Sequence, residues 1–198
     1  MQFELTGIQK INLLTKTDFI KKGNMKILIL GNIASGKSTI TQKLKPILQD
    51  FEVIAIDDFR IQYGDGSMEA EENSKQIFFD AIVEHKNQII EIMGTGDTGM
   101  QVFDKLSMFK ERSVAIILQT PLEVCMERLK NREWKVPYPA PHEKAFALAE
   151  KTDKLITSGT LSALWKILDY CTVYETNKYD EIESIIIKEI KNKENEKE

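Results

Sequence analysis

One stretch of the sequence has both the residue types and the spacing needed to hold a phosphate. Residues 31–38 read GNIASGKS and match the pattern GxxxxGK(S/T), after an apolar run and before a helical period. Glycines let the backbone turn so that successive N–H groups point inward, and the following helix adds the positive end of its dipole. We expect Lys37 to reach the β- and γ-phosphates of a nucleotide and the Ser38 hydroxyl to bind Mg²⁺. The residues expected to contact the nucleotide are Gly31, Asn32, Ala34, Ser35, Gly36, Lys37, Ser38 and Thr39.

Two adjacent carboxylates follow the second apolar run. Asp57 and Asp58 come directly after the strand-like run Val53–Ile56, and Arg60 follows shortly after them. Ligands of open parallel sheets bind beyond the carboxyl ends of the strands. A carboxylate there can accept the proton of an attacking hydroxyl, so Asp57 is the candidate general base. Arg60 is the candidate ligand of an acceptor phosphate or of the transferred phosphoryl group. The alternative is that the two carboxylates cap a helix at a strand–helix turn.

Arginine is scarce in this chain, and its positions are informative. Of the 27 basic residues only four are arginine, at positions 60, 112, 128 and 132. Arg128 and Arg132 are four residues apart and therefore share one face of the helix that Thr120 and Glu123 are expected to open with a capping box. Arginines at a helix end, before the proline-containing segment 136–141, fit a lid that neutralises charge on a transferring phosphoryl group. The alternative is a solvated basic helix end.

The third strand-like run and the residues after it hold two further candidates. Glu91 lies inside the run Gln88–Met93 and either senses Mg²⁺ through water or is an ordinary polar strand residue. Residues 94–99 read GTGDTG and match the dinucleotide-binding pattern GxGxxG, but the next strand ends near Gln119 without the acidic residue that this pattern requires. We therefore expect these glycines to shape an acceptor pocket or to form a flexible turn, and we do not expect NAD to bind.

A short motif near the C-terminus matches the guanine-reading pattern NKxD. It reads NKYD at residues 177–180 and follows the last strand-like run. A GTPase would also need the pattern DxxG after its third strand, and here Asp97 is followed by Thr98, Gly99 and Met100. We interpret the NKYD stretch as a turn and the N-terminal cap of a helix.

The elements that must position these residues alternate between strands and helices. Five strand-like runs occur at residues 26–30, 53–56, 88–93, 114–118 and 171–174. Strands that alternate with helices favour a parallel sheet covered on both faces. We predict an α/β domain at residues 25–190 with the three-layer P-loop fold and a five-stranded parallel sheet. An N-terminal arm at residues 1–24 precedes it, and a disordered tail at residues 191–198 follows.

Composition and charge narrow the possible functions. The formal net charge of −4 argues against a broad basic surface for nucleic acid or an anionic membrane. Cys125 and Cys171 fit no CxxC pattern, so we expect two reduced core thiols and neither a disulfide framework nor a zinc site. The sequence has no signal-peptide pattern and no apolar stretch long enough to cross a membrane, which predicts a cytoplasmic protein.

Together the motifs resemble those of the P-loop kinases of nucleotides, nucleosides and small molecules, over about residues 25–190. A strand that ends in Asp-Asp-aromatic-Arg and an Arg-x-x-x-Arg pattern followed by Val-Pro resemble the kinase domain of polynucleotide 5′-hydroxyl kinases, and zeta-toxin-like kinases are similar. The resemblance implies transfer of the γ-phosphate of ATP, with Mg²⁺, to a hydroxyl such as the 5′-OH of a nucleic acid or nucleotide. It implies that Asp57 is the general base, that Arg60 binds a 3′-phosphate of the acceptor and that Arg132 contacts ATP. The alternatives are a nucleoside or sugar-nucleotide-type kinase and a non-catalytic ATP-binding module.

Overall fold

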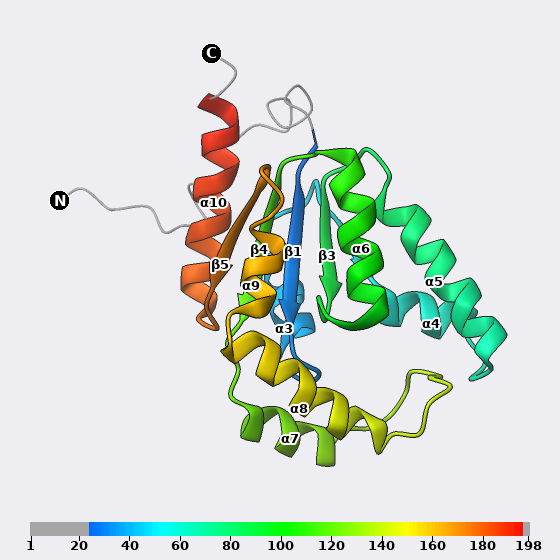
Figure 1. Ribbon diagram of the computed structural model, residues 1–198. Coiled ribbons are helices and arrows are strands. Elements are labelled where there is room, and N and C mark those ends of the chain that lie inside the picture. The colour runs from blue at the N-terminus through cyan, green and yellow to red at the C-terminus, as the bar shows by residue number, and fades with distance from the viewer. Residues whose placement is uncertain (1–23, 196–198) are drawn as a thin grey trace.

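Five parallel strands lie side by side in the order β2-β3-β1-β4-β5 (Figure 1). Their bounds are β1 Lys26–Gly31, β2 Glu52–Ala55, β3 Gln88–Ile92, β4 Ser113–Leu118 and β5 Cys171–Glu175. The computed structural model describes residues 24–195, so the predicted arm lies, apart from Asn24, outside the described residues. The prediction of a five-stranded parallel sheet is confirmed. No strand end differs from its expected position by more than one residue.

Helices cover both faces of the sheet, which explains why the central strands are mostly apolar on both faces. Every residue of β1 is buried, and successive side chains point to opposite faces. Leu28 packs in a cluster with Phe78 and Trp165, whereas Ile29 packs in a second cluster with Ile186. The helices on the first face are α4 Ile56–Tyr63, α5 Met68–Ile82, α6 Gly96–Phe109, α8 Lys144–Thr157 and α9 Thr160–Trp165. The helices on the second face are α3 Lys37–Leu44 and α10 Tyr179–Asn195.

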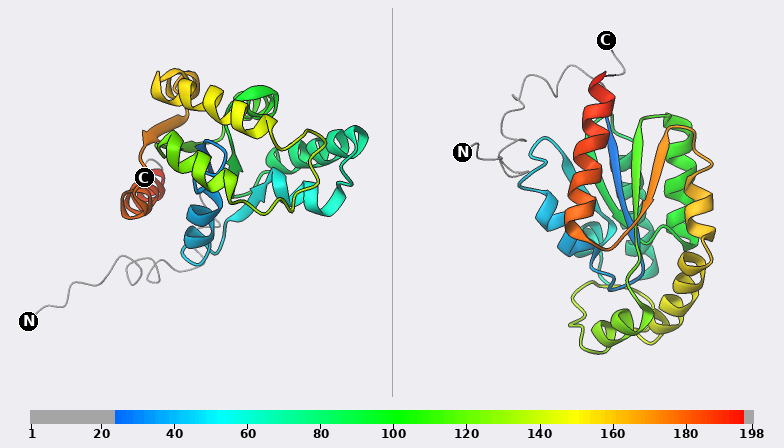
Figure 2. Two further views of the ribbon diagram at one scale, coloured as in Figure 1. Left: turned by 90° about the horizontal axis from the view of Figure 1, so that it is seen from below. Right: turned by 90° about the vertical axis from the view of Figure 1, so that its left-hand side faces the viewer.

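The carboxyl ends of the strands meet at one edge of the sheet, at the bottom of Figure 1. Helix α7, Leu122–Lys130, and helix α8 lie beyond this edge, and the segment 131–143 that joins them runs out below α4 (Figures 1 and 2). Loops at this edge of an open parallel sheet are where ligands bind. The fold therefore gathers the phosphate loop, the start of α4 and the segment 131–143 in one region.

Two helix boundaries differ from the prediction. Thr120 does not form the expected capping box with Glu123, because its Oγ1 donates a hydrogen bond to the carbonyl of Ser35 at 2.8 Å and Pro121 is the N-cap of α7. Helix α10 continues to Asn195, so helix covers residues 191–195 of the stretch predicted to be a disordered tail. The last three residues, 196–198, lie outside the described residues.

The two cysteines and the helices can be compared with what the sequence predicted. Cys125 and Cys171 are both free and buried, as predicted, and burial raises the pKa of Cys171 to about 12. Within residues 24–195, no helix is both long enough and apolar enough to cross a membrane.

The glycines of residues 94–99 belong to a tight strand–helix turn. Helix α6 begins at Gly96, and Gly94 has a φ of 78° that favours glycine. Gly99, in the first turn of α6, lies against the backbone of Gly94, so that a Cβ atom at Gly99 would come within 2.5 Å of the Gly94 carbonyl carbon. Close packing of the helix onto the turn before it therefore explains the glycine pattern.

We expect Gly99→Ala to destabilise the protein, although the same change inside an open helix ordinarily stabilises it by about 1 kcal/mol. Overpacking against the Gly94 backbone should lower the free energy of unfolding by about 1–3 kcal/mol. Urea unfolding followed by circular dichroism measures the change. Met100→Ala, at an exposed neighbouring position, is the matched control and should shift the free energy by less than about 0.5 kcal/mol. A Gly99→Ala protein more stable than the wild type would contradict the packing described here.

Candidate active site

The predicted phosphate loop connects β1 to α3 and has the backbone geometry of an anion cradle. Ala34 and Gly36 have positive φ values of 58° and 98°, and a turn closes between the N–H of Ser35 and the carbonyl of Asn32 at 3.2 Å. Left-handed residues in such a turn point successive N–H groups into one concavity. Gly36 is the N-cap of α3 and no side chain caps this helix, so its positive dipole end faces the same concavity.

Lys37 lies across the loop with its ammonium group on backbone carbonyls. Its Nζ donates to the carbonyl of Asn32 at 2.7 Å and to the carbonyl of Gly31 at 3.2 Å. Burial lowers the pKa of Lys37, while the nearby carboxylates of Glu91 and Asp57 act in the opposite direction. A cation held only by neutral carbonyls is suited to exchange them for phosphate oxygens, because charge-assisted hydrogen bonds are stronger.

Asn32 and Ser35 connect the phosphate loop to neighbouring elements, whereas Thr39 is exposed. Asn32 is buried, and its Nδ2 donates to the carbonyl of Ala149 in α8 at 2.9 Å, so its side chain ties the loop to α8. Ser35 is also buried and receives the hydrogen bond from Thr120 on its carbonyl. Thr39 lies on the exposed side of α3, directly after Ser38.

Glu91 comes close to the loop because β3 pairs with β1, in a register that places Glu91 opposite Ile29. The Ser38 hydroxyl donates to Glu91 Oε1 at 2.6 Å. Burial raises the pKa of Glu91, while Ser38 and Lys37 act to lower it. Hydroxyl and carboxylate oxygens are ligands that Mg²⁺ prefers. Among the described residues, no group of three or more His, Cys, Asp or Glu side chains could hold a metal ion.

Asp57 lies in the first turn of a helix rather than at the end of an extended strand. Strand β2 ends at Ala55 and α4 begins at Ile56, so the helix that the alternative interpretation expected after this strand is present. Asp57 Oδ1 accepts a hydrogen bond from Arg60 Nη1 at 2.9 Å, and Asp57 Oδ2 lies 3.7 Å from Arg132 Nη2. The side chain is 47% exposed, so Asp57 is an accessible carboxylate held between two guanidinium groups.

Arg128 and Arg132 reach the site from different elements, which corrects the prediction that they share one helix face. Helix α7 ends at Lys130, because Asn131 Nδ2 turns back to the carbonyl of Glu127 at 3.1 Å. Arg128 Nη1 donates to the carbonyl of Ala34 in the phosphate loop at 3.0 Å. Arg132 lies in the segment 131–143 and faces Asp57. The two side chains therefore approach the loop and the candidate base separately.

The segment 131–143 contacts α4 and the residue after it through Tyr138 and Pro137, of which only Pro137 belongs to a pattern noted in the sequence. The Tyr138 ring covers the Arg60 guanidinium at 4.9 Å, and a Cβ at Gly64 would lie 3.1 Å from Pro137. The Trp134 ring stacks on His142, with centroids 4.2 Å apart. Figure 2, in its view from below, shows the segment running from α7 towards α4. No local pattern marks these contacts, because they depend on how the segment folds back over α4.

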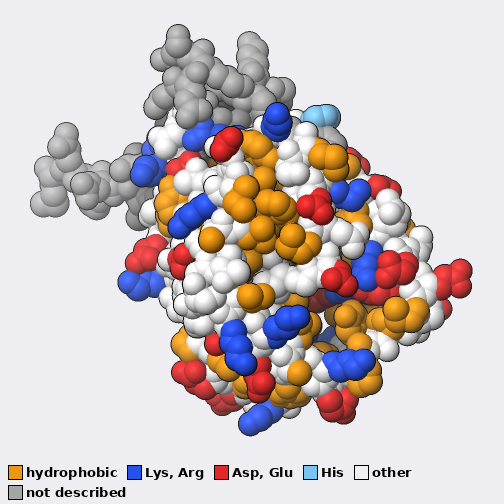
Figure 3. Space-filling view, in the orientation of Figure 1, with side chains coloured by type: hydrophobic (Ala, Val, Ile, Leu, Met, Phe, Trp, Pro, Cys, Tyr) orange, Lys and Arg blue, Asp and Glu red, His pale blue; other side chains and the backbone are white. Residues whose placement is uncertain are grey.

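Charged side chains of both signs surround this region. Figure 3 shows Lys and Arg side chains together with Asp and Glu over the lower part of the molecule, where α7, α8 and the segment 131–143 lie, and Asp and Glu side chains over the outer end of α5. A small hollow is visible between the lower part and the side of the molecule where α4 and α5 lie. The cations that face the phosphate loop are therefore supplied by α3, α7 and the segment 131–143.

The NKYD stretch forms a turn and the start of α10, as predicted. Asn177 Nδ2 donates to the carbonyl of Gln119 at 3.2 Å, and Thr176 Oγ1 donates to Glu181 at 2.6 Å. These contacts fasten the turn after β5 to the end of β4.

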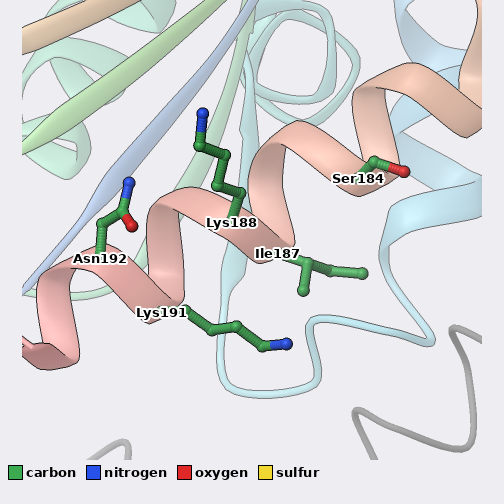
Figure 4. Close-up of a pocket in the computed structure, with 5 residues that line it drawn as sticks. All are labelled: Ser184, Ile187, Lys188, Lys191 and Asn192. Atoms are coloured by element: carbon green, nitrogen blue, oxygen red, sulfur yellow. The ribbon is translucent and has the colours of Figure 1, made fainter.

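A separate hollow runs along one face of α10 (Figure 4). Its lining residues are Ser184, Ile187, Lys188, Lys191 and Asn192. All of them come from consecutive turns of one helix, away from the carboxyl ends of the strands (Figures 1 and 4). This hollow is therefore not part of the candidate active site.

The sheet order and the phosphate loop define an α/β domain with the P-loop fold. Residues 27–145, more than half of the chain, match the AAA_18 family, which is described as an AAA domain. The chain therefore belongs to this family, and its resemblance to P-loop kinases is confirmed at the level of family and fold. No curated protein sequence matches the chain.

Solved structures with a similar fold include kinases. Shikimate kinase from Acinetobacter baumannii in complex with shikimate is similar with a TM-score of 0.56 and 16% identity, over 88% of this chain and 97% of that chain. Shikimate kinase from Bacteroides thetaiotaomicron has a TM-score of 0.54 and 9% identity, over 84% and 98%. A chain of the Pnkp1/Rnl/Hen1 RNA repair complex has a TM-score of 0.52 and 18% identity, over 71% of this chain and 48% of that chain. This protein thus spans about half the length of that chain, and at these identities the likeness shows the fold alone.

We expect Glu91→Gln to raise stability at neutral pH while it weakens Mg²⁺-dependent nucleotide binding. Since the pKa of Glu91 is raised in the folded state, the folded protein keeps a proton that the unfolded chain releases. Stability is therefore lost as the pH rises from the unfolded pKa of about 4.3 through the raised folded value. Glutamine removes this loss, so the free-energy difference between variant and wild type should grow as the pH rises above the unfolded pKa of about 4.3.

Urea unfolding without nucleotide or Mg²⁺ measures this difference, and titration calorimetry with Mg²⁺ and ATP measures binding. Glu133→Gln, at a side chain that is 79% exposed, is the control and should show no growth of the difference with pH. A stability difference for Glu91→Gln that shrinks with rising pH would contradict the role of burial described here.

Proposed function

We propose that this protein is an ATP-dependent phosphotransferase that moves the γ-phosphate of ATP to a hydroxyl group of an acceptor. The observation that carries the proposal is the accessible Asp57 carboxylate between Arg60 and Arg132, beside a phosphate loop that holds a lysine. Asp57 and Glu91 both act electrostatically on Lys37, so the carboxylates and the loop form one charged site. A module that only bound nucleotide would have no use for a carboxylate held in this way.

The donor half of the site is built from the phosphate loop and α7. The N–H groups around Ala34 and Gly36 and the ammonium of Lys37 bind the phosphates. Arg128, on the Ala34 carbonyl, lies close enough to the loop to move onto a bound phosphate. Ser38 and Glu91 would hold Mg²⁺. A bound Mg²⁺ would neutralise part of the phosphate charge.

The transfer step follows from the position of Asp57. The oxygen of the acceptor hydroxyl forms a bond to the γ-phosphorus while the bond from that phosphorus to the β–γ bridging oxygen breaks, and ADP leaves. Asp57 accepts the proton of the hydroxyl. Arg132 turns from Asp57 to the phosphoryl oxygens, where charge is spread in the transition state.

Two acceptor classes have support from different observations. The Asp57-Asp58-Phe59-Arg60 sequence and the fold shared with the RNA repair complex favour a 5′-hydroxyl of a nucleic acid or nucleotide. The fold shared over nearly the full length of shikimate kinase favours a small-molecule alcohol. We propose the 5′-hydroxyl as the first acceptor to test and a nucleoside, sugar or other small alcohol as the second. A cytoplasmic location remains part of the proposal.

Labelled γ-phosphate transfer from ATP tests the function and separates the acceptors. The acceptors to compare are a 5′-hydroxyl oligonucleotide, nucleosides, sugars and shikimate. Asp57→Ala should lower transfer about 10²- to 10⁴-fold, because a general base contributes that much. Titration calorimetry should show that ATP binding is retained, since Asp57 does not contact the phosphate loop.

Asp58→Ala is the matched control, because Asp58 is the exposed neighbour in the same helical turn and should keep wild-type transfer. Absence of transfer from the wild type to every acceptor would refute the proposed function. Full transfer by Asp57→Ala would refute only the assignment of the base.

A further inference from the structure

Arg60 has a second carboxylate partner that the sequence did not indicate. Glu71 lies near the start of α5 and its side chain is only 2% exposed, while that of Arg60 is 12% exposed. Arg60 Nε donates to Glu71 Oε2 at 2.8 Å, and Arg60 Nη2 donates to Glu71 Oε1 at 2.7 Å. This is the bidentate geometry that fixes a guanidinium plane as well as its position.

The same guanidinium is held on two further sides. Its Nη1 donates to Asp57 Oδ1 at 2.9 Å, and the Tyr138 ring covers one of its faces at 4.9 Å. Three of the five N–H groups of Arg60 are therefore engaged by carboxylates. The fork that could grip a phosphate with two parallel hydrogen bonds faces Glu71.

The ion pairs of Arg60 with Glu71 and Asp57 are better explained by the orientation of the Arg60 side chain than by a gain in stability. A carboxylate as buried as Glu71 is tolerated only when it is paired, and a buried ion pair is often no more stabilising than apolar residues of similar volume. Burial acts against the charged form of Arg60, but the hydrogen bonds and charges of Glu71 and Asp57 outweigh it and raise the pKa of Arg60. Arg60 therefore keeps its charge despite its burial.

We propose that Glu71 is a positioning residue for phosphoryl transfer, which fixes Arg60 so that Arg60 in turn holds Asp57 by one oxygen. The inference rests on the proposed function. With Oδ1 bound to Arg60, the second oxygen of Asp57 faces Arg132. Asp57 then presents one defined oxygen to the acceptor hydroxyl. Positioning is the role we propose for Arg60 in place of the phosphate ligand that the family resemblance implies.

Glu71→Gln tests the inference because it keeps the size of the side chain and removes its charge and one acceptor. Arg60 then loses its bidentate hydrogen-bond partner, and Asp57 is no longer held in place. We expect kcat to fall about 10²-fold, which is the cost of a small misplacement of a catalytic group. The KM values for ATP and for the acceptor found with the wild type should not change, because Glu71 contacts neither. Arg60→Lys keeps a cation beside Glu71 but loses the planar guanidinium group and its bidentate hydrogen bonds. It should show the same fall in kcat.

The matched control is Glu72→Gln, the next residue on α5. Glu72 is 66% exposed and pairs with Lys75 through Oε1 at 2.8 Å, and it should keep wild-type kcat. The double variant Glu71→Gln with Arg60→Lys should lose no more than either single variant, because the two side chains act as one unit. The Arg60 Nε–H resonance in a two-dimensional ¹H–¹⁵N spectrum reports the clamp without any acceptor, and it should lose its protection from solvent exchange in Glu71→Gln.

The outcomes separate the inference from the function on which it rests. If the wild type transfers phosphate to no acceptor, the proposed function fails. If the wild type is active and Glu71→Gln keeps its kcat although the Arg60 resonance has lost protection, the positioning role is overturned. A raised KM for the acceptor with unchanged kcat also overturns it, since Arg60 would then bind the acceptor directly.

Discussion

The pairing of β1 with β3 fixes the distance between the phosphate loop and the carboxylate that faces it. The loop begins where β1 ends, and the register that places Glu91 opposite Ile29 leaves its carboxylate 2.6 Å from the Ser38 hydroxyl on the far side of the loop. A slip of one residue would turn Glu91 to the other face of the sheet, into the cluster around Phe78. Burial of that charge among apolar side chains opposes such a slip, so the Glu91 carboxylate and the core around it together set the geometry of the site.

Charge in the site is balanced by pairs that link separate elements. Arg60 of α4 joins Glu71 of α5, and Arg132 of the segment 131–143 joins Asp57 of α4. An overall negative chain can therefore hold a phosphate site, because only a few cations need to face the loop and each is oriented by a partner. Arginine suits these places better than lysine because its planar fork fixes direction as well as charge.

The sequence was informative where a feature depends on consecutive residues, and less so where it depends on packing. The phosphate loop and the five strands have local signatures, so their positions could be predicted. A helix at the position of α4 was expected only as an alternative, because its eight residues follow β2 without a loop or a capping side chain. Arg132 was assigned to a helix that ends two residues earlier, where Asn131 turns back on Glu127. Glu71, eleven residues from Arg60, has no local signal at all, since the packing of α5 on α4 brings the two together.

The contact between Arg132 and Asp57 is the weakest link among the charged pairs of the candidate site. At 3.7 Å the pair is loose compared with the 2.7–2.9 Å contacts of Arg60, and Arg132 is 33% exposed. Under the proposed function, a nucleotide phosphate, which carries more charge than one carboxylate, would compete for Arg132. Arg60 would not follow, because Glu71 holds it. Binding of ATP would then free one oxygen of Asp57 for the acceptor proton while the other oxygen stays fixed.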